Sequence, residues 1–136
     1  MNLDEARQFL RENHRTVLST FRADGRPQLS PVAAAVDADG RAIVSSRETA
    51  FKVKHLRRDP RVWLCCLTKQ FYGQWLLIHG RANIVSLPEA MDGLIDYYRR
   101  ISGEHPDWDD YRQAMEREQR VIIRIAIERA GPEKQG

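Results

Sequence analysis

The sequence lacks the features that would place it outside the ordinary globular proteins. Its 136 residues contain no low-complexity tract, no internal repeat and no apolar run near the ~20 residues that cross a membrane. The N-terminal segment has no apolar core of the kind that marks a signal peptide. We therefore expect one domain over residues 1–136 with a loose tail at 130–136, in the cytoplasm and without a membrane partner.

Cysteine is scarce, and the motifs of common catalytic and phosphate-binding sites are missing. The two cysteines, Cys65 and Cys66, are adjacent, and strand neighbours point to opposite faces, which suits neither a disulfide nor a metal site. The sequence has no glycine-rich phosphate loop and no nucleophile elbow. The acidic segment 103–110 matches no common ligand spacing and is typical of helix capping. The sequence therefore predicts no metal.

Positive charge, in contrast, is concentrated in one short segment. The net charge is only +3, but five cations fall between Lys52 and Arg61 with a single acid, Asp59. Acidic residues return throughout 89–118, so the chain lacks the long basic stripe that nucleic acid requires. We therefore predict no nucleic-acid partner, which leaves a phosphate-bearing ligand or an ordinary solvated helix.

Hydrophobic periodicity predicts a mainly β protein with peripheral helices. Apolar runs bounded by turns indicate six strands, at 15–21, 28–36, 41–46, 61–68, 74–85 and 120–130. Amphipathic patterns indicate four helices, at 3–13, 48–59, 88–101 and 106–118. Because most strands follow one another without a helix between them, a six-stranded antiparallel barrel is favoured. Pro31 suggests an edge strand or a bulge, Gly80 suggests a bulge, and strand 74–85, apolar on both faces, suggests a homodimer.

Lys52 is the best candidate for contact with a phosphate. It lies one turn from the start of the expected helix, at the border of its apolar side, where free backbone N–H groups and the positive helix end also favour an anion. Ser45 and Ser46, at the end of the preceding strand, can add hydroxyl donors. Lys54 and Arg58 project to the opposite side of the helix. A solvated surface remains the alternative for all three cations.

Three stretches make the chain resemble a known family: DGRPQLSPV, LRRDPRV and YYRRISGEHPDWDDYRQAM. Over almost its whole length it is similar to the split-barrel flavin and deazaflavin reductases related to pyridoxamine 5'-phosphate oxidase. Within that group it most resembles the small actinobacterial enzymes that use coenzyme F420, an 8-hydroxy-5-deazaflavin. The resemblance implies a six-stranded split barrel of the FMN-binding type and a homodimer with two cofactor sites, each formed by both subunits.

The resemblance also implies where the cofactor lies. The phosphate is expected at Lys52, the ring along 27–30 and 44–46, and a polyglutamate tail near Lys54 and Arg58. The implied cofactor-binding residues are Gln28, Ser30, Ser45, Ser46, Arg47, Phe51, Lys52, Lys54, Arg58 and Trp75, although a core role for Trp75 remains open. Ala50 departs from the family, whose flavin oxidases carry an arginine there, which weighs against tight FMN binding.

The implied reaction is hydride transfer from reduced F420 to an activated double bond or a quinone of a small-molecule substrate. Since the cofactor supplies the chemistry, we name no catalytic side chain. Two alternatives stay open. One is an FMN-dependent oxidoreductase on the same fold, and the other is a non-catalytic protein that binds flavin or deazaflavin.

Overall fold

Eight β-strands and four α-helices make up the residues that this computed structural model describes, 1–132 and 134–135. The helices are α1 Leu3–Glu12, α2 Phe51–Arg58, α3 Met91–Ser102 and α4 Trp108–Arg117. The strands are β1 Arg15–Phe21, β2 Pro27–Ala33, β3 Ala35–Val36, β4 Ala42–Arg47, β5 Arg61–Leu67, β6 Gln74–Val85, β7 Arg120–Ala130 and β8 Lys134–Gln135. The mainly β composition with peripheral helices is therefore confirmed.

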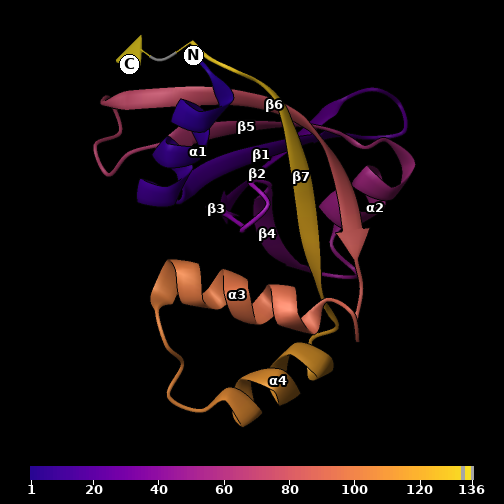
Figure 1. Cartoon of the computed structure of the whole chain (residues 1–136). Helices are drawn as coiled ribbons and strands as arrows, with labels where there is room; N and C mark the ends of the chain where they lie inside the picture. The colour runs from indigo at the N-terminus through magenta and orange to yellow at the C-terminus, as the bar shows by residue number, and fades with distance from the viewer. Residues whose placement is uncertain (133, 136) are drawn as a thin grey trace.

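The strands form one curled antiparallel sheet in the order β2-β1-β5-β6-β7-β4-β3, with β8 paired to β6 (Figure 1). The prediction of six strands is wrong, because the run at 28–36 divides into β2 and β3 and because β8 is additional. The division falls at Ala34. The chain pairs with β1 as far as Ala33 and joins β4 from Ala35 onward. An uninterrupted apolar run gives no sign of such a change of partner.

Two irregularities expected from single residues are present. Pro31 lies in β2, an edge strand of the sheet, where a residue without an N–H is tolerated. The register of β6 against β7 shifts between His79 and Gly80. A Cβ at Gly80 would lie 2.3 Å from the carbonyl oxygen of Ala126, so the close approach of the two strands leaves no room for a side chain.

The inner face of the curled sheet carries the main hydrophobic core. Buried side chains alternate along β1, β5 and β6, and α1 and α2 pack onto this face with Leu10 and Leu56. A second, smaller core forms where α3 and α4 pack against Ile43 and Ile122. Figure 1 shows these two helices together at one end of the sheet.

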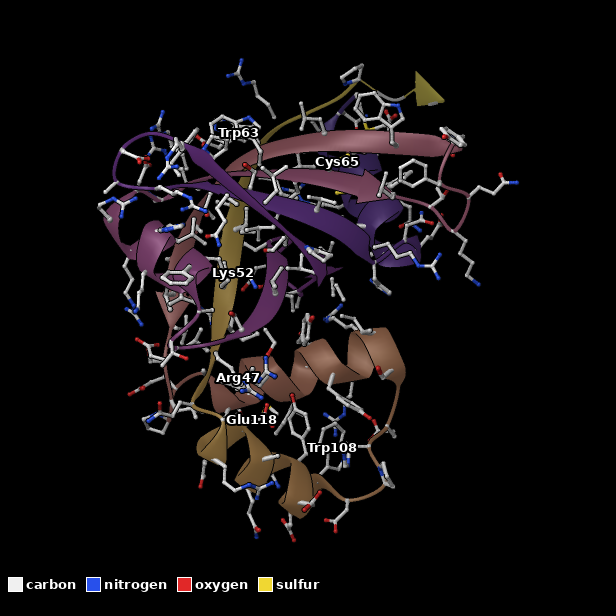
Figure 2. All side chains as sticks on the ribbon, turned by 180° about the vertical axis from the view of Figure 1, so that it is seen from behind. Arg47, Lys52, Trp63, Cys65, Trp108 and Glu118 are labelled. Carbon is white, nitrogen blue, oxygen red and sulfur yellow. The ribbon has the colours of Figure 1, made fainter. Side chains whose placement is uncertain are left out.

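The outer face of β2, β1, β5 and β6 is also apolar but is partly exposed. Cross-strand pairing places several apolar side chains on this face. Six of them, near its centre, we call the outer patch: Val17, Leu29, Pro31, Trp63, Cys65 and Leu77. Leu29 is 62% exposed and Leu77 is 37% exposed. In Figure 2, Trp63 and Cys65 lie on the side of the molecule away from α3 and α4.

The cysteines and the chain end complete the fold. Cys65 and Cys66 are both free, and burial raises the pKa of the Cys66 thiol to about 12, so it is no nucleophile at neutral pH. None of the described helices has the length and apolar character needed to cross a membrane. Within the expected loose tail, residues 134–135 pair with β6 as β8, and residues 133 and 136 lie outside the described residues.

Candidate functional site

A cavity of about 530 Å³ lies between the β1–β2 hairpin and helix α2. Its lining, which we call the cationic cavity, consists of Arg22, Ala23, Asp24, Arg26, Gln28, Phe51, Lys54, His55 and Arg58. Four cationic side chains thus face a single carboxylate. Gln28, Phe51, Lys54 and Arg58 were predicted as site residues, and the fold brings these four together.

The single acid of the cationic cavity is already engaged by one of its cations. Asp24 accepts a hydrogen bond from Nε of Arg26 at 2.7 Å and another from the Arg26 backbone N–H at 3.0 Å. Arg58 donates to the carbonyl oxygen of Phe21, which carries no charge. Within the described part of the chain, neither Arg22 nor Lys54 forms an ion pair, although the charge of Arg22 contributes to lowering the pKa of Asp24. The cavity therefore carries positive charge that is not neutralised by carboxylates and that could pair with an anionic ligand.

Gln28 places an unpaired acceptor in the same cavity. Its Oε1 atom is sealed from solvent and has no hydrogen-bond partner among the described residues. A buried amide oxygen without a donor costs free energy, roughly 1–3 kcal/mol. A ligand in the cavity would reach this atom, and remove that cost, only after the Gln28 side chain turns outward.

His55 stands at the back of the cationic cavity. Its Nδ1 atom lies 3.0 Å from Oγ1 of Thr20, which is buried in β1, and its ring stacks on Phe51 with centroids 6.3 Å apart. Burial lowers the pKa of His55, and the guanidinium groups of Arg58 and Arg22 lower it further. The imidazole is therefore neutral at neutral pH.

Lys52 lies on a different side of α2 from the cationic cavity. Its ammonium group is half-buried beside Arg120, and burial and then this neighbouring charge lower its pKa. No carboxylate pairs with Lys52 among the described residues. Helix α2 begins at Phe51; its N-cap residue, Ala50, provides no side-chain cap, and its first turn has no acid. Two unneutralised positive features, the ammonium group and the helix N-terminus, thus lie close together.

The remaining predicted residues fall at three places in the fold. Ser45 and Ser46 lie in β4, next to the turn that leads into α2, and Ser46 is buried. Ser30 lies two residues after Gln28 along β2. Arg47 is exposed and pairs with Glu118 at 3.4 Å, and Figure 2 shows these two near α3 and α4.

Trp75 is separate from the other predicted residues. It pairs across the sheet with Leu67 of β5, next to the loop at 68–73, and it lines none of the cavities described above. The structure therefore does not bring Trp75 together with Gln28 or Lys52.

Sequence reasoning missed five of the nine lining residues of the cationic cavity, among them Arg22, Arg26 and His55. The first two flank Asp24-Gly25, which the sequence marks only as a turn. The cluster KVKHLRR contained His55, but an isolated histidine carries no site signal by itself. The packing of the turn over α2 is a long-range contact, and only this contact makes the three residues neighbours.

A second cavity, of about 510 Å³, has the opposite character. Glu48 and Glu116 line it together with Arg120. Arg57 donates to both carboxylate oxygens of Glu48, at 2.7 and 2.8 Å. Two carboxylates make this cavity unsuitable for a polyanion. In the part of the chain that is described, no cluster of histidine, cysteine or acidic side chains is arranged to hold a metal ion.

The fold and the site together define a small antiparallel β protein with a cavity lined by four cationic side chains. Comparison with known proteins identifies the family of the chain. Residues 3–132 match the model of the pyridoxamine 5'-phosphate oxidase family, and the chain belongs to that family. The resemblance found in the sequence is thereby confirmed.

Two relatives come from Mycobacterium tuberculosis. The chain is 31% identical over 127 residues to the F420H2-dependent biliverdin reductase of this organism. The alignment covers 93% of this chain and 84% of the relative. The crystal structure of a conserved hypothetical protein from the same organism has a TM-score of 0.77 at 27% identity, covering 96% of this chain and 82% of that one.

A solved F420 reductase shares the fold, with a TM-score of 0.68 at 21% identity over 91% of this chain and 94% of that chain. These relationships place the chain in an oxidoreductase family and point to a flavin or deazaflavin cofactor.

Proposed function

We propose that this protein is an F420H2-dependent reductase that transfers a hydride to an activated double bond of a small conjugated molecule. The observation that carries the proposal is the excess of cations in the cavity beside α2, where four cationic side chains face one carboxylate that is already paired. The relative named F420H2-dependent biliverdin reductase makes biliverdin the first substrate to test.

The residues present fit a cofactor that has a ring, a phosphate and a polyanionic tail. Gln28 lines the cavity, and its amide oxygen would accept from a ring N–H once the side chain turns towards the ligand. The half-buried ammonium group of Lys52, beside the uncapped start of α2, suits a phosphate. Lys54 and Arg58 are placed to bind tail carboxylates. FMN has no such tail, and Ala50 lacks the charge that would strengthen a phosphate contact.

The protein's part in the reaction is binding and orientation. A bound F420H2 supplies the hydride, and no side chain is required to form a covalent bond. Gln28 and Ser30 would contact the cofactor from β2, Ser45 or Ser46 would contact it from β4, and the cations beside α2 would bind its anionic groups. The substrate would then stack on the exposed ring face.

We further propose that the protein is a homodimer in which a second copy covers the outer patch. An exposed apolar sheet face of this kind is typical of a protein interface. His79 lies on the same face, and its ring stacks on Trp63 with centroids 4.4 Å apart. Both of its ring nitrogens are buried without a hydrogen-bond partner among the described residues, so a partner subunit could supply one. Sedimentation should give a dimer for the wild-type protein and a monomer for Leu77→Glu; a wild-type monomer at micromolar concentration would contradict this arrangement.

The cofactor assignment is tested by parallel titration with F420 and FMN, followed by tryptophan fluorescence. We expect F420 to bind at least about tenfold more tightly, a difference of roughly 1.4 kcal/mol. A tenfold preference for FMN would replace the proposal with an FMN-dependent oxidoreductase.

Activity is tested by oxidation of F420H2 in the presence of biliverdin, quinones and conjugated enones. We expect at least one of these to accelerate oxidation in a protein-dependent manner. Saturable F420 binding with no acceptor-dependent oxidation across this panel would indicate a cofactor-binding protein without catalytic function.

A further inference from the structure

His55 is the only titratable residue of the cationic cavity whose charge can change near neutral pH. Its Nδ1 atom is held by Thr20 at 3.0 Å, and its ring is packed against Phe51. The other ring nitrogen, Nε2, has no hydrogen-bond partner within residues 1–132 and 134–135. Unlike the nitrogens of His79, it is not sealed from solvent. The orientation of the imidazole is thus fixed while one nitrogen remains free to bind.

We propose that His55 is a proton-linked ligand of this cavity: a polyanion that binds among the four cations draws a proton onto His55, which then adds a fifth positive charge to the site. The proposal deepens the proposed function, since the expected polyanion is the polyglutamate tail of F420. It also assigns a binding role to His55, which was not among the site residues predicted from the sequence.

The physical argument follows from what surrounds the imidazole. In the empty cavity, desolvation and the nearby guanidinium groups of Arg58 and Arg22 oppose protonation. Carboxylates placed between these cations reverse the local field and offer an acceptor for Nε2–H. The pKa of His55 then rises, so the complex holds one more proton than its separated components at a pH between the two pKa values. By linkage, affinity increases as the pH falls through that interval.

Charged groups reach His55 from two elements. Lys54 and Arg58 project from its own helix, and the β1–β2 hairpin presents Arg22, Arg26 and Asp24. Strand β6, which also packs against α2, contributes buried apolar side chains such as Ile78 and Ala82. Asp24 is the one carboxylate among the described residues that line this cavity. It is exposed and hydrogen-bonded to Arg26, so it does not pair with a protonated His55.

The test uses tetraglutamate with an acetylated amino end as the probe. Its carboxylates titrate near pH 4.3, so it is largely ionised at about pH 5.5 and above. The pKa of each of the four histidines is measured by NMR with and without the peptide. We expect the pKa of His55 to rise in the complex, while the pKa values of His14 and His105, which lie outside the cavity, stay unchanged.

A second measurement compares the affinity for the peptide at about pH 5.5 and about pH 7.5, around the usual histidine pKa. The wild-type protein should bind more tightly at the lower pH, with a slope of up to about tenfold per pH unit. His55→Gln, which keeps a polar side chain, should lose that dependence, and the matched control His105→Gln should retain it. Circular dichroism confirms that each variant is folded.

Three results would overturn the inference: no binding of the peptide, an unchanged His55 pKa in the complex, or an unaltered pH dependence in His55→Gln. The outcomes also separate this inference from the proposed function. If F420H2 is oxidised while the His55 pKa does not move, only the proton linkage fails. If the peptide shifts His55 but F420 does not bind, only the cofactor assignment fails.

Discussion

Replacing Lys52 with methionine should move cofactor affinity and protein stability in different directions. Methionine keeps a long flexible side chain and removes only the ammonium group. In the structure this group is half-buried, lies beside Arg120 and has no carboxylate partner among the described residues. We therefore expect the free energy of unfolding of Lys52→Met to stay constant or to increase by less than about 1 kcal/mol.

The affinity of Lys52→Met for F420 should fall by about 1.5–3 kcal/mol, the value of a charge-assisted hydrogen bond to phosphate, which corresponds to a roughly tenfold to hundredfold weaker complex. Lys54→Met is the matched control. The Lys54 side chain is exposed and lies over the Phe51 ring at 5.6 Å, so its contact with a tail carboxylate is screened by solvent. Its loss should cost about 1 kcal/mol or less.

Calorimetric titration of both variants at two salt concentrations measures these differences, and urea unfolding measures stability. Lys52→Met should also show a weaker salt dependence than the wild-type protein, because one ionic contact is missing. Equal and small losses of affinity for the two variants would refute the placement of the phosphate at Lys52. A loss of stability well above 1 kcal/mol would instead mean that Lys52 has a partner in the folded protein.

Three further predictions concern stability. Gln119 has φ 51°, so Gln119→Gly should raise the free energy of unfolding by about 1 kcal/mol in urea titration; a decrease would mean that its side chain contributes more than the backbone conformation costs. A hydrogen bond from Arg61 lowers the pKa of Asp59 from 3.8 to about 2, so its stabilisation is complete above pH 4–5 and is lost as the pH falls towards 2. Asp59→Asn should remove that part of the acid sensitivity, and an unchanged acid profile would show that the unfolded state shares the shift. Ala50→Ser and Ala50→Asp should each stabilise α2 by about 0.5–2 kcal/mol as caps, but only the aspartate should weaken F420 binding; equal affinities would argue against an anion at the helix start.

The sequence predicted local features well because they depend on nearby residues. Period-two alternation located the strands, and Gly80 marked the bulge because a side chain there would collide with β7. The change of strand partner at Ala34 was not predictable in the same way. All residues from Gln28 to Val36 suit an extended conformation, and only the positions of β1 and β4 in space decide where pairing with one ends and pairing with the other begins.

The same limit applies to the site. Lys54 and Arg58 were assigned to one side of a helix from spacing alone, and both line the cationic cavity. Arg22 and His55 are 33 positions apart in the sequence, and no periodic pattern connects a turn with a helix that packs beneath it. What brings them together is the curl of the sheet, which places the β1–β2 hairpin beside α2.

Helix α2 gives the strongest structural reason to assign a functional site to this region. A helix start is normally stabilised by a capping side chain and by acidic residues. The N-cap residue of α2 is instead Ala50, which cannot cap, and Lys52 and Lys54 lie near the positive end of the helix. The helix persists because Val53 and Leu56 are buried in the main core. Local preferences that are overridden in this way are expected where a site serves binding rather than stability. An anion at this end of α2 would neutralise the charges that oppose the helix, so the ligand would stabilise the element that binds it.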